Sequence, residues 1–96
     1  MPTYEGLPRF WREFNDLSAE EQARFLNAVS LLMRLLRSGE AIPGLRLKGV
    51  TAHPGVFEIT WGPDRRATFE YGAQVRPGHS HIIWRRVGTH DIFRDP

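Results

Sequence analysis

The hydrophobic pattern of this 96-residue chain changes its period at Pro43-Gly44. Before this point apolar residues recur at helical spacing, and after it they alternate as in β-strands. A chain of this length folds as one domain, which we place at residues 1–96. Helices grouped before strands predict an α+β fold. We expect an N-terminal helical hairpin packed on one face of a small antiparallel sheet of three to four strands.

The second of the two helical segments has the clearest boundaries. Ser18, followed three residues later by Glu21, forms a capping box at its start. Gly39 suits the left-handed cap at its end. Between them, four apolar residues form one stripe of a 3.6-residue period: Phe25, Val29, Leu32 and Leu36. The first segment, from Pro8 to Asn15, places three aromatic residues on one face: Phe10, Trp11 and Phe14.

Three strands are predicted at residues 56–61, 66–71 and 81–87, and the segment from Leu45 to Lys48 could add a short one. Gly62-Pro63-Asp64 has turn chemistry. A three-residue loop there aligns Ile59 with Ala67, Phe57 with Phe69, and Thr60 with Arg66. The face opposite the apolar one is unusually polar, with Glu58, Thr60, Arg66, Thr68 and Glu70.

The charge of the chain is distributed unevenly. Residues 1–45 carry five Arg against six acids, whereas residues 46–96 carry eight Lys or Arg against five acids and all four histidines. Twelve of the thirteen basic residues are Arg, whose planar fork suits phosphate, although a GC-rich genome gives the same bias. The absence of cysteine excludes disulfides and thiolate metal sites. Without an 18-residue apolar run or a secretory signal, we expect a cytoplasmic protein with no membrane span.

Four stretches of the chain resemble the RelE/ParE superfamily of toxin–antitoxin toxins over about residues 10–94. They are Leu45-Arg46-Leu47-Lys48-Gly49, Gly55 to Trp61, Arg65 to Tyr71, and Ile82 to Gly88. The resemblance implies a toxin that cleaves mRNA, often on the ribosome, without a metal or other cofactor, and that a cognate antitoxin protein silences. ParE-like members instead poison DNA gyrase. An inactivated relative that serves as a binding module is a third alternative.

Two departures from the family pattern concern the ends of the chain. Many RNA-cleaving members follow the last strand with a Tyr, but Phe93 stands near that position and has no hydroxyl. This leaves the general acid undefined. The usual first strand is also hard to find, because Pro2 to Pro8 is short and broken by prolines.

Cutting RNA without a metal requires proton transfers and positive charge around the phosphorus. His90 is the candidate acid or base because imidazole titrates nearest neutral pH, and Asp91 beside it could act itself, were its pKa raised, or tune the local field. Arg66 and Arg86 complete the predicted catalytic set. The predicted RNA-binding residues are Lys48, Arg65, Arg85 and Arg46. Alternation directs Arg85 and Arg86 to opposite faces, so one of them joins Lys48, Arg66 and His90 in a positive pocket opposite the helices.

Each candidate also has a structural interpretation. His79 and His81 could bind zinc, but a third ligand is not evident, so we expect no metal and solvated loop histidines; His53 is expected to be structural. His90 could cap the last strand. The paired arginines could form ion pairs with Glu58 or Glu70. Glu58 could be a general base or a partner of Arg66, and Trp61 and Trp84 could stack on bases or belong to the core.

Overall fold

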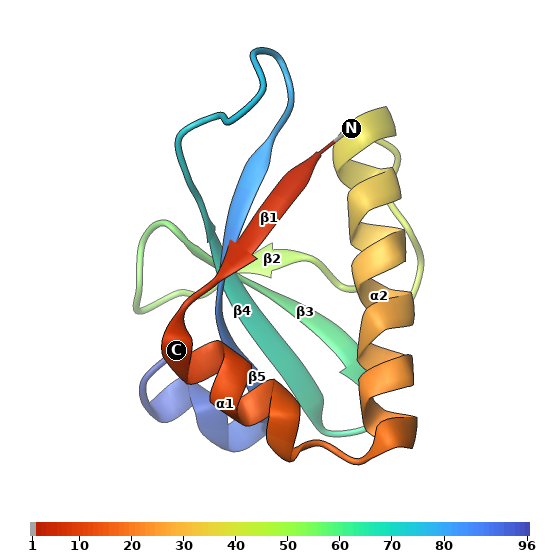
Figure 1. The fold of residues 1–96 in the computed structure, drawn as a ribbon, viewed down its shortest axis with the longest axis vertical. Helices are drawn as coiled ribbons and strands as arrows, with labels where there is room; N and C mark the ends of the chain where they lie inside the picture. Colours follow the sequence, from red (N-terminus) through yellow and green to blue (C-terminus); the bar gives the residue numbers. More distant parts are fainter. Residues whose placement is uncertain (1) are drawn as a thin grey trace.

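The computed structural model describes residues 2–96. Five strands form one sheet in the order β1-β5-β4-β3-β2. β1 is parallel to β5, and the other pairs are antiparallel. The elements in chain order are β1 (Thr3–Gly6), α1 (Pro8–Asp16), α2 (Ala19–Ser38), β2 (Lys48–Gly49), β3 (Val56–Gly62), β4 (Arg65–Tyr71), β5 (His81–Thr89) and the 3-10 helix η1 (His90–Arg94). The α+β prediction is confirmed, with a sheet of five strands rather than three or four (Figure 1).

The long helix α2 begins and ends where the sequence predicts. The backbone N–H of Glu21 donates to Ser18 Oγ, and the N–H of Ser18 donates to Glu21 Oε1, each at 3.1 Å. Gly39 takes the left-handed conformation at φ 76°, which a residue without a side chain adopts at little cost. Within residues 2–96, no helix is both long and apolar enough to span a membrane.

The β3–β4 hairpin has the predicted register. Ile59 pairs with Ala67, Phe57 with Phe69, and Thr60 with Arg66. A register shift between Thr60 and Gly62 and the positive φ of Asp64, 54°, close the turn. The polar residues of β3 and β4 therefore share one sheet face, as the alternation predicted.

The core between the helices and the sheet is aromatic. Trp84 of β5 is fully buried and lies 5.8 Å from Phe10 of α1 and 5.2 Å from Phe25 of α2, measured between ring centroids. Trp61 is also buried, with its ring 5.7 Å from that of Phe25. Both tryptophans are core residues, so they are not platforms for stacked bases.

The edge strand β1 was not found in the sequence, because a four-residue strand between prolines carries too little pattern. It is held by His81, which pairs with Thr3 across the parallel ladder. His81 Nδ1 lies 2.7 Å from Thr3 Oγ1, and its Nε2 lies 2.9 Å from Glu5 Oε1. The expectation that His81 is a solvated loop residue was wrong, since its side chain is buried in this pairing.

Candidate functional site

Three rows of residues cross the sheet on the face opposite the helices, the open face. This face is identified by alternation, because the neighbours of these residues along each strand point into the core. The rows are Thr60–Arg66–Gly88, Lys48–Glu58–Thr68–Arg86, and Val56–Glu70–Ile83. The open face is therefore polar at its centre and carries charges of both signs.

The C-terminal segment folds onto one end of the open face. Gly88 lies on the open face, because its neighbour Val87 is buried in the core. A Cβ atom added to Gly88 would lie 3.1 Å from Cγ2 of Ile92. Ile92 of η1 is itself buried. Arg66 pairs with Gly88, two residues before His90. The fold thus brings Arg66 and His90 to the same end of the open face.

His90 is the exposed first residue of η1. The Thr89 hydroxyl caps this short helix by accepting from the backbone N–H of Asp91 at 3.3 Å. The His90 ring lies edge-on to Phe93, with centroids 4.9 Å apart. The Phe93 ring therefore packs against the imidazole of His90 and orients it. Asp91, the next residue in the chain, is exposed.

Arg66 is a half-buried cation whose charge remains available. Its Nη1 donates to the backbone carbonyl of Arg65 at 2.9 Å. Within residues 2–96, no carboxylate forms an ion pair with it. A phosphate reaching this end of the sheet would find an arginine that no carboxylate of the described residues pairs with.

The other cations of the open face have acidic partners. Lys48 Nζ lies 3.8 Å from Glu58 Oε1, so Glu58 pairs with Lys48 and not with Arg66. Arg85 Nη1 lies 3.5 Å from Glu70 Oε2, which is the ion pair considered from the sequence. These pairs reduce the positive charge that Lys48 and Arg85 present.

The guanidinium groups of Arg86 and Arg65 are bound by carboxylates of the two helices. A β-bulge between Thr68 and Phe69 shifts the β4–β5 register, so that Arg86 pairs with Thr68. Its guanidinium binds Glu13 of α1, which accepts from Nε at 2.9 Å and from Nη2 at 2.7 Å. These hydrogen bonds raise the pKa of Arg86 above its ordinary value. Arg65 forms an ion pair with Glu21 of α2 at 2.8 Å. The charges of Arg65 and Arg86 are thus paired with helix carboxylates, whereas no carboxylate within residues 2–96 forms an ion pair with Arg66.

Comparison with solved structures identifies the fold. A chain of the E. coli DinJ–YafQ complex superimposes with a TM-score of 0.62 at 16% identity, covering 95% of this chain and 96% of that one. The YoeB/ParE toxin of Agrobacterium tumefaciens gives a TM-score of 0.65 at 12% identity, covering 92% of this chain and 98% of that one. A chain of the archaeal RelE–RelB complex of Pyrococcus horikoshii gives a TM-score of 0.59 at 12% identity, covering 92% of this chain and 93% of that one. No protein-family model matches the sequence, and no curated protein matches it significantly.

The chain has the fold of the RelE/ParE-type toxins. The resemblance noted in the sequence is confirmed at the level of structure. The likeness spans nearly the whole chain, so the helical hairpin, the sheet and its C-terminal extension all belong to the RelE/ParE-type fold.

Two residues of α2 that face the sheet edge were missed by the sequence analysis. Arg24 and Asn27 line a hollow of about 550 Å³ together with Arg46 and Arg66. Arg46, an exposed residue at φ 53°, lies at this hollow. Helical spacing places Arg24 and Asn27 on one side of α2. Their proximity to the β3–β4 turn is a long-range contact that no local pattern encodes.

Proposed function

We propose that this chain is the toxin of a type II toxin–antitoxin system and acts as a metal-independent mRNA endoribonuclease. The observation that carries the proposal is the placement of Arg66, which no carboxylate within residues 2–96 neutralises, at the same end of the open face as His90. The fold shared with YafQ-, YoeB/ParE- and RelE-containing structures supports the same assignment.

In the proposed reaction the 2′-oxygen attacks the adjacent phosphorus and the bond to the 5′-oxygen breaks. The products are a 2′,3′-cyclic phosphate and a 5′-hydroxyl. Arg66 donates to a non-bridging oxygen and stabilises the charge that develops there. His90, whose ring packs against Phe93, serves one of the two proton transfers: it takes the proton of the 2′-hydroxyl or protonates the leaving 5′-oxygen. Water serves the other transfer. Asp91 tunes the field around the imidazole, and Lys48 and Arg85 contact phosphates farther along the open face.

We propose a cognate antitoxin as the protein partner and the cytoplasm as the site of action. The DinJ–YafQ and RelE–RelB structures are complexes, and the former is described as a toxin–antitoxin complex. The mRNA substrate would be bound either free or on the ribosome. A short reading frame beside this gene, whose co-expression restores growth, would identify the antitoxin.

Induced expression followed by mapping of RNA ends tests the proposal. The wild-type chain is expected to stop protein synthesis and to leave mRNA with 5′-hydroxyl ends. His90→Gln should lower the cleavage rate by about 10²–10⁴-fold, the usual contribution of general acid–base catalysis. Arg12→Gln, which removes an exposed arginine of α1, is the matched control and should cleave normally. Intact mRNA with a DNA-damage response would indicate gyrase inhibition, and absence of any growth effect would indicate a binding module.

A further inference from the structure

Within residues 2–96, β2 is the strand that pairs with the outer edge of β3, and its ladder covers two residues of it. β2 pairs with Phe57 and Glu58 of β3. Farther along β3, toward the β3–β4 turn, the Thr60 N–H donates to the Leu45 carbonyl at 2.9 Å. Past this point lies the hollow of about 550 Å³, which we call the β3-edge hollow. Its walls are formed by α2 residues between 24 and 31, by residues 43–46, by the end of β3 with the following turn (residues 60–64), and by Arg66 of β4.

The β3-edge hollow is cationic. Three arginines line it, namely Arg24, Arg46 and Arg66, against the single carboxylate of Asp64. Arg24 is paired with Glu20 at 3.3 Å, but Glu20 is 83% exposed, and an exposed pair of this kind is weak. Within the described part of the chain, no carboxylate forms an ion pair with Arg46 or Arg66.

The backbone around the β3-edge hollow is held in unusual conformations. Of the non-glycine residues in 2–96, the two with positive φ are Arg46 at 53° and Asp64 at 54°, and both line the hollow. An arginine in the left-handed region is strained, and such strain clusters where a ligand is bound. A Cβ built on Gly62 would lie 3.3 Å from Arg24 Cδ, so this glycine lets the Arg24 stem lie against the end of β3.

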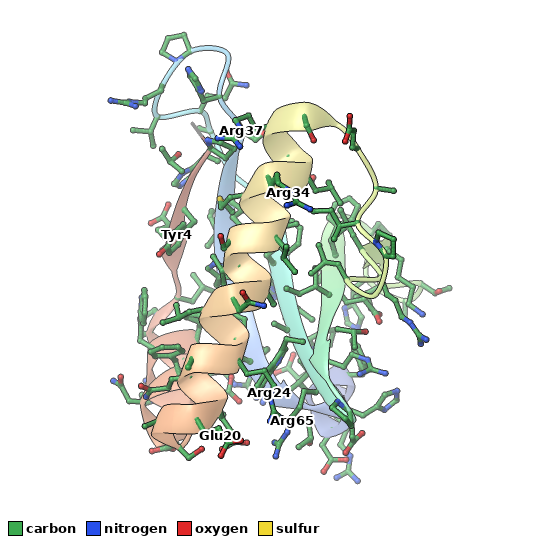
Figure 2. The ribbon with its side chains drawn as sticks, turned by 90° about the vertical axis from the view of Figure 1, so that its right-hand side faces the viewer. Tyr4, Glu20, Arg24, Arg34, Arg37 and Arg65 are labelled. Atoms are coloured by element: carbon green, nitrogen blue, oxygen red, sulfur yellow. The ribbon has the colours of Figure 1, made fainter. Side chains whose placement is uncertain are left out.

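The β3-edge hollow is continuous with the proposed catalytic end of the open face, because Arg66 and Thr60 belong to both. Figure 2 shows Arg24 near Arg65, at the end of α2 beside the β3–β4 turn, whereas Arg34 lies toward the other end of the helix. A strand bound at Arg66 can therefore continue around the edge of β3 toward α2.

We propose that the β3-edge hollow binds a backbone phosphate of single-stranded RNA, next to the phosphate that is cleaved. Arg24 and Arg46 hold this phosphate through their guanidinium groups, which match phosphate oxygens geometrically. The Asn27 amide and the Thr60 hydroxyl provide neutral hydrogen-bonding groups on the same walls. The inference rests on the proposed ribonuclease function and adds Arg24 and Asn27 to its RNA-binding surface.

Binding of an uncleavable RNA tests this subsite independently of catalysis. The probe is a fluorescein-labelled 12-nucleotide 2′-O-methyl RNA, which lacks the attacking hydroxyl, titrated by anisotropy at several salt concentrations. Arg24→Gln should weaken binding about tenfold at low salt, the loss expected for one charged hydrogen-bonded contact. It should also reduce the slope of log affinity against log salt by about 0.7, the value for one phosphate on a single strand. Arg34→Gln removes the same charge elsewhere on α2 and should change neither quantity by that amount.

Each outcome separates the subsite from the nuclease proposal. Equal effects of Arg24→Gln and Arg34→Gln, with both variants melting like the wild type, would overturn the subsite, as would failure of the wild type to bind the probe. If the wild type still cleaves natural mRNA in that case, the nuclease function stands alone. If it binds the probe through Arg24 but never cleaves, the nuclease function fails and an RNA-binding surface remains.

Discussion

The guanidinium of Arg86 and the carboxylate of Glu13 meet through two hydrogen bonds, which join β5 to α1 across 73 residues of chain. The third nitrogen of Arg86 donates to the Asp95 carbonyl at 2.8 Å. The Asp95 carboxylate accepts from Arg9 at 2.7 Å. One arginine thus ties the first helix, the last strand and the C-terminal segment together, close to the end of the sheet where His90 lies.

Loss of this contact is expected to destabilise the fold. Glu13→Gln keeps the shape of the side chain but leaves a guanidinium that is 14% exposed without its anion. Hydrogen bonds to charged groups contribute about 1.5–3 kcal/mol, so the free energy of unfolding in urea should fall by that amount. Glu20→Gln removes a carboxylate that is 83% exposed and should cost less than about 1 kcal/mol. Equal stability of the two variants would show that Arg86 is not anchored through Glu13.

Arg66 and Arg85 are expected to differ in their contribution to RNA cleavage. Arg66→Gln removes a cation without a carboxylate partner, and its loss should lower the cleavage rate by about 10²–10³-fold, as for a lost transition-state donor. Arg85→Gln removes a cation already paired with Glu70 at 3.5 Å, so its effect should stay below about tenfold. Cleavage of a defined mRNA by the purified variants measures both. A larger loss of activity with Arg85→Gln than with Arg66→Gln would indicate that the catalytic site lies nearer Arg85 on the open face.

The pH dependence of stability should include a contribution from Glu21. The backbone N–H of Ser18, which donates to its carboxylate, holds the pKa of Glu21 below 4.5, and the Ser18 hydroxyl and Arg65 act in the same direction. Because the pKa is lower in the folded state, the ionised carboxylate stabilises the fold above the unfolded pKa. This stabilisation is lost as the pH falls through the folded pKa. Glu21→Gln should therefore be less stable than wild type at neutral pH, and in urea unfolding the difference should disappear as the pH is lowered through the folded pKa of Glu21. A difference independent of pH would contradict this.

The parts of the fold encoded locally could be predicted from the sequence. Ser18 and Gly39 define α2 because capping acts within one turn of a helix. Ile59 and Ala67 pair as expected because a short loop fixes the register of a hairpin. β1 escaped prediction, since its pairing with β5 depends on residues such as Thr3 and His81 that lie far apart in sequence.

The candidate site was predicted in part. Arg66 and His90 share one end of the open face because the hairpin register and the last strand determine their positions. The prediction that Arg85 and Arg86 point to opposite faces assumed unbroken alternation, which the β-bulge between Thr68 and Phe69 interrupts. The pairing of Arg86 with Glu13 joins residues 73 positions apart, so no local pattern encodes it. Arg24 was not considered, because its approach to the β3–β4 turn depends on how α2 packs across the sheet.

Replacement of His81 is expected to release β1 without unfolding the rest of the sheet. Its ring contacts Thr3 and Glu5, and β1 otherwise holds to β5 through a four-residue ladder. His81→Leu fills much of the buried volume with an apolar side chain but removes the ring nitrogens, so the Thr3 hydroxyl loses its hydrogen-bond partner. Amide hydrogen exchange should then accelerate at Thr3 and Leu7, whose N–H groups donate to Ser80 and Trp84. Amides of the β3–β4 ladder should stay protected, because local opening of an edge strand needs less free energy than global unfolding. Uniform acceleration across β3, β4 and β5 would show instead that His81 supports the whole sheet.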